Sequence, residues 1–221
     1  MAKIRKQVKT VDKWKKKKWF TLIAPKLFQE RPLGGTPSSS NDILIGRTVK
    51  VNLMTLMNNI KRQNMAVEFE IVEVKGEQAH TQVKAIALVP SFIKRRVRRN
   101  RDRIDASFIC VTKDNKHIRI KPLLITLSRT SRLIQGHLRQ ALIDYTVQTV
   151  AKMNYDEFVN EIVNYRFQKD VRNMLNKTYP VTASEIRSME LLTGDPAKFK
   201  IATVKEEKNP TEETAELEVA A

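Results

Sequence analysis

The chain has 221 residues, of which 41% are apolar, and its 41 Lys and Arg residues against 24 Asp and Glu give a formal net charge of +17. The apolar fraction is sufficient for a folded core, while 6% aromatic residues and six glycines argue against a repetitive all-β scaffold and a glycine-loop nucleotide binder. Because so many like charges repel one another in a compact chain, this composition indicates a polyanionic partner.

The charge is unevenly distributed along the chain. Residues 94–103, called the arginine segment below, hold seven cations and one anion, and residues 1–18, the basic arm, hold nine cations and one anion. Residues 205–221 hold six glutamates and two lysines and form an acidic tail. We expect the arm and the tail to be disordered in the free protein, because neither shows apolar periodicity.

The first 90 residues predict mainly strands. The ordered part is expected to begin at residues 19–23, with Trp19, Phe20 and Phe28 in the core. Residues 32–40, rich in Gly, Pro and Ser, predict a loop. The next elements are a strand over 43–51 interrupted by Gly46, a helical turn over 53–57, and a hairpin of strands 65–74 and 79–89.

A second hairpin is predicted after the arginine segment. Its strands cover residues 103–112 and 117–126, and Asn115 at the turn tolerates the left-handed backbone that Gly would otherwise supply. The arginine segment therefore lies between two folded hairpins. Ser91, Phe92 and Ile93 precede it and are expected to anchor it to the fold.

From residue 131 the apolar spacing changes to that of helices. One helix is predicted by the spacing of Ile134, Leu138, Leu142, Tyr145 and Thr149. A second helix begins at Asn154, with Glu157 completing a capping box, and residues 167–175 predict a third. Residues 181–192 predict a final strand.

Strands followed by helices, without regular alternation, favour an α+β fold with an antiparallel, barrel-like sheet over a doubly wound fold. We expect one α+β domain over residues 19–204, between the basic arm and the acidic tail. No apolar run approaches the length of a membrane span, and no apolar signal core follows the basic arm, so an intracellular soluble protein is expected.

Motifs for catalysis or cofactor binding are absent from the sequence. No phosphate-binding glycine loop or nucleophile elbow is present, and His80, His117 and His137 lack metal-ligand spacing. The one cysteine, Cys110, lies in an apolar, strand-like run and is expected to be a packed, inert thiol. No cofactor, metal or small-molecule substrate is expected.

One catalytic alternative stays open. A nuclease needs paired carboxylates to hold metal ions, and Asp102, Asp105 and Asp114 are the candidates. Asp102 and Asp105 flank Arg103, so pairing with neighbouring arginines is the simpler interpretation. A second alternative is a chromatin-like DNA-binding protein.

The arginine segment gives the strongest functional signal. The planar guanidinium fork suits phosphate oxygens, and successive arginines can follow a nucleic-acid backbone. Trp14, which lies among lysines, is a candidate for stacking on bases. No sequence-reading RNA motif is visible, so recognition of backbone and shape in folded RNA is expected.

An ordered series of short motifs over about residues 14–192 resembles a known family, the small-subunit ribosomal proteins of the S-three-A type shared by archaea and eukaryotes. The motifs are Lys18-Trp19-Phe20, Ala24-Pro25-Lys26, Gly35-Thr36-Pro37, Leu44-Ile45-Gly46-Arg47, Arg103-Ile104-Asp105, Val111-Thr112-Lys113-Asp114, Tyr155-Asp156-Glu157-Phe158-Val159 and Tyr179-Pro180. The chain departs from the family pattern at Asn115, where the family usually has Gly, and after Pro180, where the family is usually basic. The length and the short basic arm resemble the archaeal form.

This resemblance implies a non-enzymatic constituent of the small ribosomal subunit in the cytoplasm. It would bind ribosomal RNA and neighbouring ribosomal proteins on the platform, near the messenger exit region, and would have no membrane partner. The expected RNA-binding residues are five lysines at the end of the arm, the seven cations of the arginine segment and three other arginines. They are Lys13, Lys15, Lys16, Lys17, Lys18, Arg47, Lys94, Arg95, Arg96, Arg98, Arg99, Arg101, Arg103, Arg129 and Arg132.

Overall fold

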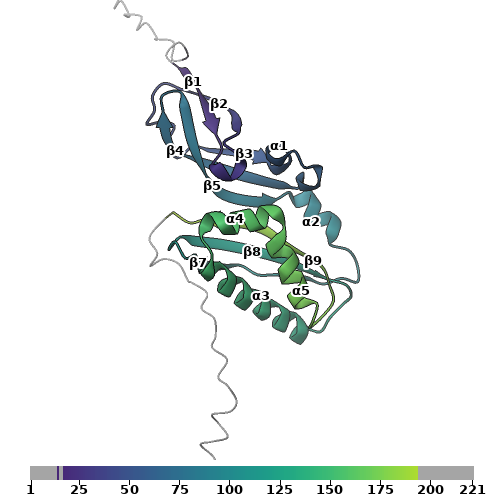
Figure 1. Cartoon of the computed structure of the whole chain (residues 1–221). Coiled ribbons are helices and arrows are strands. Elements are labelled where there is room, and N and C mark those ends of the chain that lie inside the picture. Colours follow the sequence, from purple (N-terminus) through teal and green to yellow (C-terminus); the bar gives the residue numbers. More distant parts are fainter. Residues whose placement is uncertain (1–13, 15–16, 194–221) are drawn as a thin grey trace, which may run out of the picture. The chain divides into compact units, whose positions relative to one another are not determined.

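A computed structural model describes Trp14 and residues 17–193 of the chain. Contacts divide these residues after Val89 into two compact units, unit 1 before that point and unit 2 from Pro90 onward. In Figure 1 the strands of unit 1 run from purple to blue, and helices α3, α4 and α5 of unit 2 are green. A single α+β domain over residues 19–204 stays a prediction. The basic-arm residues 1–13, 15 and 16 and the whole acidic tail lie outside the described residues.

Unit 1 is built mainly from strands that pair in the order β2-β1-β5-β4-β3. Its elements are β1 (Lys18–Ile23), a 3₁₀ turn (Lys26–Phe28), β2 (Pro32–Ser38), β3 (Thr48–Asn52), α1 (Leu53–Met57), a 3₁₀ turn (Ile60–Arg62), β4 (Met65–Lys75) and β5 (Gln78–Leu88). All these pairings are antiparallel except that of β1 with β5. No pairing between β2 and β3 is found among the described residues, so strand pairing does not close the sheet of unit 1 into a barrel.

The hairpin predicted over residues 65–89 is confirmed, and its alternation places one row of side chains in the core. Met65, Val67, Phe69 and Ile71 on β4 are all buried, and Phe28 meets the Phe69 ring edge-on at 5.5 Å. The helical turn predicted over 53–57 is confirmed as α1.

Two predictions for unit 1 are wrong. The composition of residues 32–40 predicts a loop, but most of these residues form β2, an edge strand in which Gly35 pairs with Thr21 of β1. The strand predicted over 43–51 begins only at Thr48, because Gly46, with φ of +83°, sits in a turn. Composition alone could not reveal that a neighbouring strand supplies the missing hydrogen bonds.

The predicted core position of Trp19 is also wrong, although Phe20 and Phe28 are buried as predicted. Successive side chains of a strand point to opposite faces, so the inward-facing Phe20 sends Trp19 outward, where it is 67% exposed. The Trp19 ring lies over Gly35, where an added Cβ would come within 3.3 Å of it.

Among its described residues, unit 2 combines strands with four helices. Its elements are α2 (Pro90–Arg96), β6 (Arg103–Asp105), β7 (Phe108–Val111), β8 (His117–Thr126), α3 (Arg132–Lys152), α4 (Tyr155–Asn164), α5 (Arg166–Leu175) and β9 (Val181–Leu191). Strand β8 lies between β9 on one side and β6 and β7 on the other, all antiparallel. Helix α3 packs against β6, β7 and α5, and α5 against α4 and β9 (Figure 1). The α+β class is therefore confirmed.

The turn of the second hairpin and the three helices predicted after residue 131 are confirmed, whereas α2 was not predicted. Asn115 adopts φ of +56° at the turn, and the capping box of α4 forms with Asn154 N–H donating to Glu157 at 3.0 Å. The strand predicted over 103–112 is broken into β6 and β7 opposite Pro122. Proline has no N–H for the strand ladder, which accounts for the break.

None of the helices in the described part of the chain is both long and apolar enough to cross a lipid bilayer.

Candidate nucleic-acid interface

The arginine segment begins inside a short helix. Pro90 opens α2, a position where its missing N–H costs no hydrogen bond, and Lys94, Arg95 and Arg96 form the last turn. Cations at a helix C-terminus are favoured by the partial negative charge of its free carbonyls. Of the three residues expected to anchor this segment, Ile93 is buried and Phe92 is half-buried, whereas Ser91 is exposed.

Phe92 organises two of the arginines. The guanidinium carbon of Arg96 lies 5.0 Å from the centre of the Phe92 ring, and that of Arg95 lies 5.8 Å away. Such contacts hold a cation over the ring face without neutralising its charge. Arg95 and Arg96 follow Phe92 by three and four positions, and residues at this spacing share one face of a helix. The spacing could therefore have predicted the contact of both arginines with Phe92, whereas Phe92 was predicted only as an anchor.

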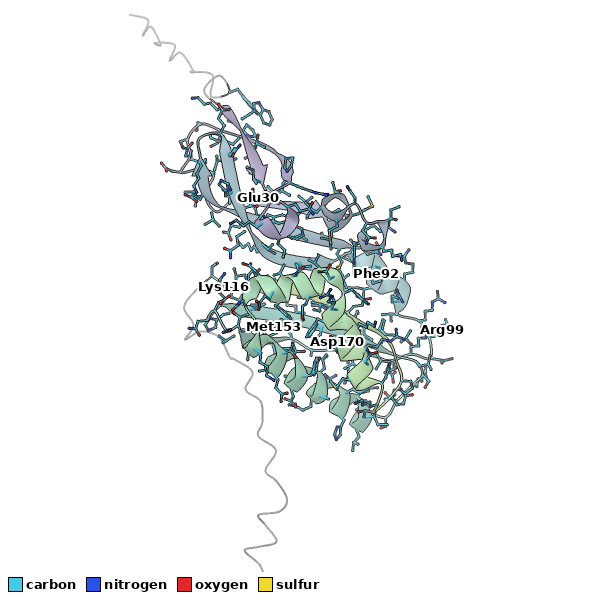
Figure 2. The ribbon with its side chains drawn as sticks, in the orientation of Figure 1. Glu30, Phe92, Arg99, Lys116, Met153 and Asp170 are labelled. Atoms are coloured by element: carbon cyan, nitrogen blue, oxygen red, sulfur yellow. The ribbon has the colours of Figure 1, made fainter. Side chains whose placement is uncertain are left out.

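An open hollow lies beside this aromatic ring. It has a volume of about 440 Å³ and is lined by Phe92, Arg95, Arg96, Arg98 and Arg101. Figure 2 shows Phe92 on α2 and Arg99 on the loop that follows, with the Arg99 side chain extending away from the ribbon. The helix and its loop thus gather guanidinium groups around an open surface depression.

Helix α2 also acts electrostatically on the core of unit 2. Burial raises the pKa of Tyr165, as does its neighbour Glu185, whereas the Arg96 and Arg172 guanidinium groups oppose this shift. The Tyr165 hydroxyl is hydrogen-bonded to a Glu185 carboxylate oxygen at 2.5 Å. The exposed Arg96 side chain therefore acts on the pKa of the half-buried Tyr165, which is hydrogen-bonded to the buried Glu185.

Arg103 differs from the other cations of the arginine segment because it forms an ion pair. Its Nη2 lies 2.7 Å from Oδ2 of Asp105, so its guanidinium already has an anionic partner in the protein. Within the described ranges, none of the other six cations of the segment makes an ion pair. These six are Lys94, Arg95, Arg96, Arg98, Arg99 and Arg101.

Arg129 and Arg132 come from a later part of unit 2. Arg129 lies in residues 127–131, called the 127–131 loop, and Arg132 is the first residue of α3. Both side chains are exposed. The loop is hydrogen-bonded to Asp102 through Thr130, at 2.6 Å from the Thr130 amide to the Asp102 carboxylate. The fold therefore brings the 127–131 loop next to the arginine segment.

The remaining predicted cations belong to unit 1 or to the arm. Arg47 donates from Nη1 to Thr36 Oγ1 and to the Pro37 carbonyl, both at 3.2 Å, so it links β2 to the turn before β3. Lys17 lies 3.9 Å from the centre of the Trp14 ring, and Lys18 opens β1 with an exposed side chain. Lys13, Lys15 and Lys16 lie outside the described residues. RNA contacts by any of these residues stay predictions.

The three carboxylates of the nuclease alternative have separate structural partners. Asp105 pairs with Arg103, and Asp102 accepts from the amide of Thr130. Asp114 accepts from the Tyr155 amide at 3.0 Å, at the first turn of α4. No group of three or more His, Cys, Asp or Glu side chains suited to a metal ion occurs in the described part of the chain.

Cys110 is a packed thiol, as predicted. It is 1% exposed on β7, and burial raises the pKa of its thiol to about 12. A thiol with this pKa holds almost no reactive thiolate at neutral pH.

Comparison with known proteins gives the family. Residues 5–195 match the model of the Ribosomal S3Ae family, which is most of the chain. The chain belongs to the ribosomal S3Ae family. It is 31% identical over 192 residues to the small ribosomal subunit protein eS1 of Methanobrevibacter smithii, covering 87% of this chain and 100% of that protein.

Other eS1 proteins are similarly related. That of Nanoarchaeum equitans is 35% identical over 178 residues, covering 80% of this chain and 90% of the relative. That of Archaeoglobus fulgidus is 30% identical over 200 residues, covering 90% and 94%. These archaeal relatives support the expected archaeal form, and the family agrees with the one that the motif series indicated.

Proposed function

We propose that this protein is a structural constituent of the small ribosomal subunit and binds ribosomal RNA through the arginine segment. The observation that supports the proposal is the presence of six exposed or half-exposed cations without ion-pair partners among the described residues, in a member of the S3Ae family. Phosphate groups would neutralise these cations and release the counterions condensed on the RNA, which gives binding free energy.

The rigid parts of the site suit a folded RNA surface. The last turn of α2 places Arg95 and Arg96 over the Phe92 ring, and Arg101 lines the same hollow, so these three guanidinium groups are already gathered before binding. Phosphate contacts of this kind position a protein on RNA without reading its sequence. Further contacts would come from the basic arm, which we propose folds onto the RNA during assembly.

The wider assignment rests on the family. Its relatives are named as small ribosomal subunit proteins, and we propose the same assembly for this chain, with neighbouring ribosomal proteins as further partners. A cytoplasmic location in the ribosome, a place on the platform near the messenger exit region and a non-catalytic role in translation, without cofactor or small-molecule substrate, belong to the same proposal.

Two measurements test this function. In a sucrose gradient of a cell lysate, the protein should co-sediment with small subunits at high salt, and a protein that remains at the top of the gradient would refute the assignment. In a binding competition, a transcript of archaeal small-subunit RNA should displace a labelled RNA fragment far better than duplex DNA of equal length. Equal displacement would favour the chromatin-like alternative, and magnesium-dependent RNA cleavage lost in Asp105→Ala would favour the nuclease alternative.

A further inference from the structure

Asp102 is the one anion of the arginine segment, and its carboxylate reaches across to another part of unit 2. Oδ2 accepts hydrogen bonds from the Thr130 amide at 2.6 Å, the Thr130 hydroxyl at 3.1 Å and Gln135 Nε2 at 3.0 Å. All three donors lie about thirty residues further along the chain. Hydrogen bonds to a charged acceptor are stronger than neutral ones, so this carboxylate is a strong local link.

The backbone of Asp102 is fixed as well. Its N–H donates to Thr126 Oγ1 at 2.9 Å, and its carbonyl accepts from the Thr126 amide at 3.0 Å. Thr126 is fully buried at the end of β8, and its hydroxyl also donates to the Ser128 carbonyl at 2.7 Å. The start of the 127–131 loop and the end of the arginine segment are therefore tied to the same buried residue.

The hydrogen bonds between Asp102 and Thr130 also bring together two segments whose arginines would otherwise repel each other. The hydrogen bond from the Thr130 backbone is the main reason that the pKa of Asp102 is lowered, and the nearby Arg129 charge lowers it further. Asp102 is thus negatively charged at neutral pH and lies between Arg101 and Arg103 on its own segment and Arg129 on the other. An anion in this position offsets the mutual repulsion of the surrounding guanidinium groups.

We propose that Asp102 is a positioning residue that joins the arginine segment and the 127–131 loop into one composite surface for RNA backbone phosphates. This inference rests on the proposed function and goes beyond it, because it makes RNA affinity depend on an anion. The cations of the composite surface are Arg98, Arg99, Arg101, Arg129 and Arg132.

The salt dependence of RNA binding tests this role. If Asp102 only repelled phosphate, Asp102→Ala would bind RNA more tightly, with an undiminished slope of log K against log salt. If Asp102 positions the loop, the slope should instead become shallower by about 1.5, which corresponds to two fewer phosphate contacts at roughly 0.7–0.9 each, although the net charge has become more positive. A slope equal to or steeper than that of the unmodified protein overturns the proposal.

A double-mutant cycle assigns the effect to the 127–131 loop. Arg129→Gln should make the slope shallower by about 0.7–0.9 in the unmodified protein and by less than about 0.3 in the Asp102→Ala background. Equal effects in both backgrounds overturn the proposal. Asp105→Ala is the matched control, because it also removes one carboxylate near the arginine segment but releases Arg103 from its ion pair. The slope of log K against log salt for Asp105→Ala should therefore not become shallower.

Hydrogen exchange separates this inference from the proposed function. In the free, full-length protein, the Thr130 amide should exchange faster in Asp102→Ala than in the unmodified protein, and unchanged exchange overturns the link without any RNA present. Gln135→Ala removes one donor only and should shift the RNA slope in the same direction by less, which keeps the test informative if Asp102→Ala fails to fold. If the unmodified protein does not bind the RNA transcript, the proposed function fails and this inference fails with it.

Discussion

The salt slope of RNA binding should report directly how many arginines contact phosphate. We consider replacement of Arg95, Arg96, Arg98 and Arg99 by Gln, which retains much of each side-chain stem and removes four positive charges. All four side chains are exposed, and no ion pair in the described part of the chain neutralises them. Removing one arginine–phosphate interaction should lower the slope by roughly 0.7–0.9, so the change expected for four is about 3.

That change is large on an affinity scale. When salt rises from about 50 to 200 mM, a slope difference of about 3 corresponds to a roughly 60-fold difference in the decrease of affinity. The measurement is fluorescence anisotropy of a labelled transcript of archaeal small-subunit RNA at four or more salt concentrations. Circular dichroism should show that the variant is folded, since none of the four side chains is buried.

A matched control separates local contacts from net charge. Four lysines of the described residues are held in ion pairs, and their replacement by Gln also removes four charges. They are Lys50, Lys75, Lys84 and Lys121. The control slope should change by less than about 1, because these lysines already have partners. If the slope decreases equally in both variants, the reasoning is wrong and the RNA responds only to overall charge.

Three further predictions concern the fold. Cys110, whose thiol has a pKa raised to about 12 by burial, should not react with a thiol reagent at neutral pH until denaturant is added; fast labelling of the folded protein would contradict the packing. The hydrogen bonds that Asp102 accepts lower the pKa of its carboxyl below the ordinary 3.8. The stabilisation of the fold by the charged carboxylate should therefore be complete well above 3.8 and lost as the pH falls through the lowered pKa. The difference in unfolding midpoint between the unmodified protein and Asp102→Asn should therefore be constant from neutral pH down to about pH 5 and should shrink as the pH falls below 3.8, and a difference that stays constant there would count against this. Because the Phe158 side chain is fully buried, Phe158→Ala should lower the free energy of unfolding by about 3–5 kcal/mol. In the same denaturation experiment, one unfolding transition shared by both units would support a single domain, whereas two transitions would contradict it.

Several features of the protein could be predicted because they depend on neighbouring residues. The helix starting at Asn154 and the turn at Asn115 follow from hydrogen bonds and backbone preferences within a few residues. The alternation of Val67 and Phe69 with polar residues fixes which face of β4 is buried. The charge of the arginine segment is likewise a property of the sequence alone, and so is its implication of a polyanionic partner.

Only the tertiary structure decided which arginines of the segment have a partner within the protein and which do not. The pairing of Arg103 with Asp105, rather than with Asp102, depends on side-chain directions that the sequence does not specify. Residues 32–38 form a strand because β1 offers them an edge, although their composition is that of a loop. The joining of Asp102 to Thr130 requires β8 to place two segments about thirty residues apart side by side, and no local pattern encodes a contact over that distance. The sequence by itself therefore determined that the protein carries a concentrated positive charge, and the fold determined the surface on which that charge is assembled.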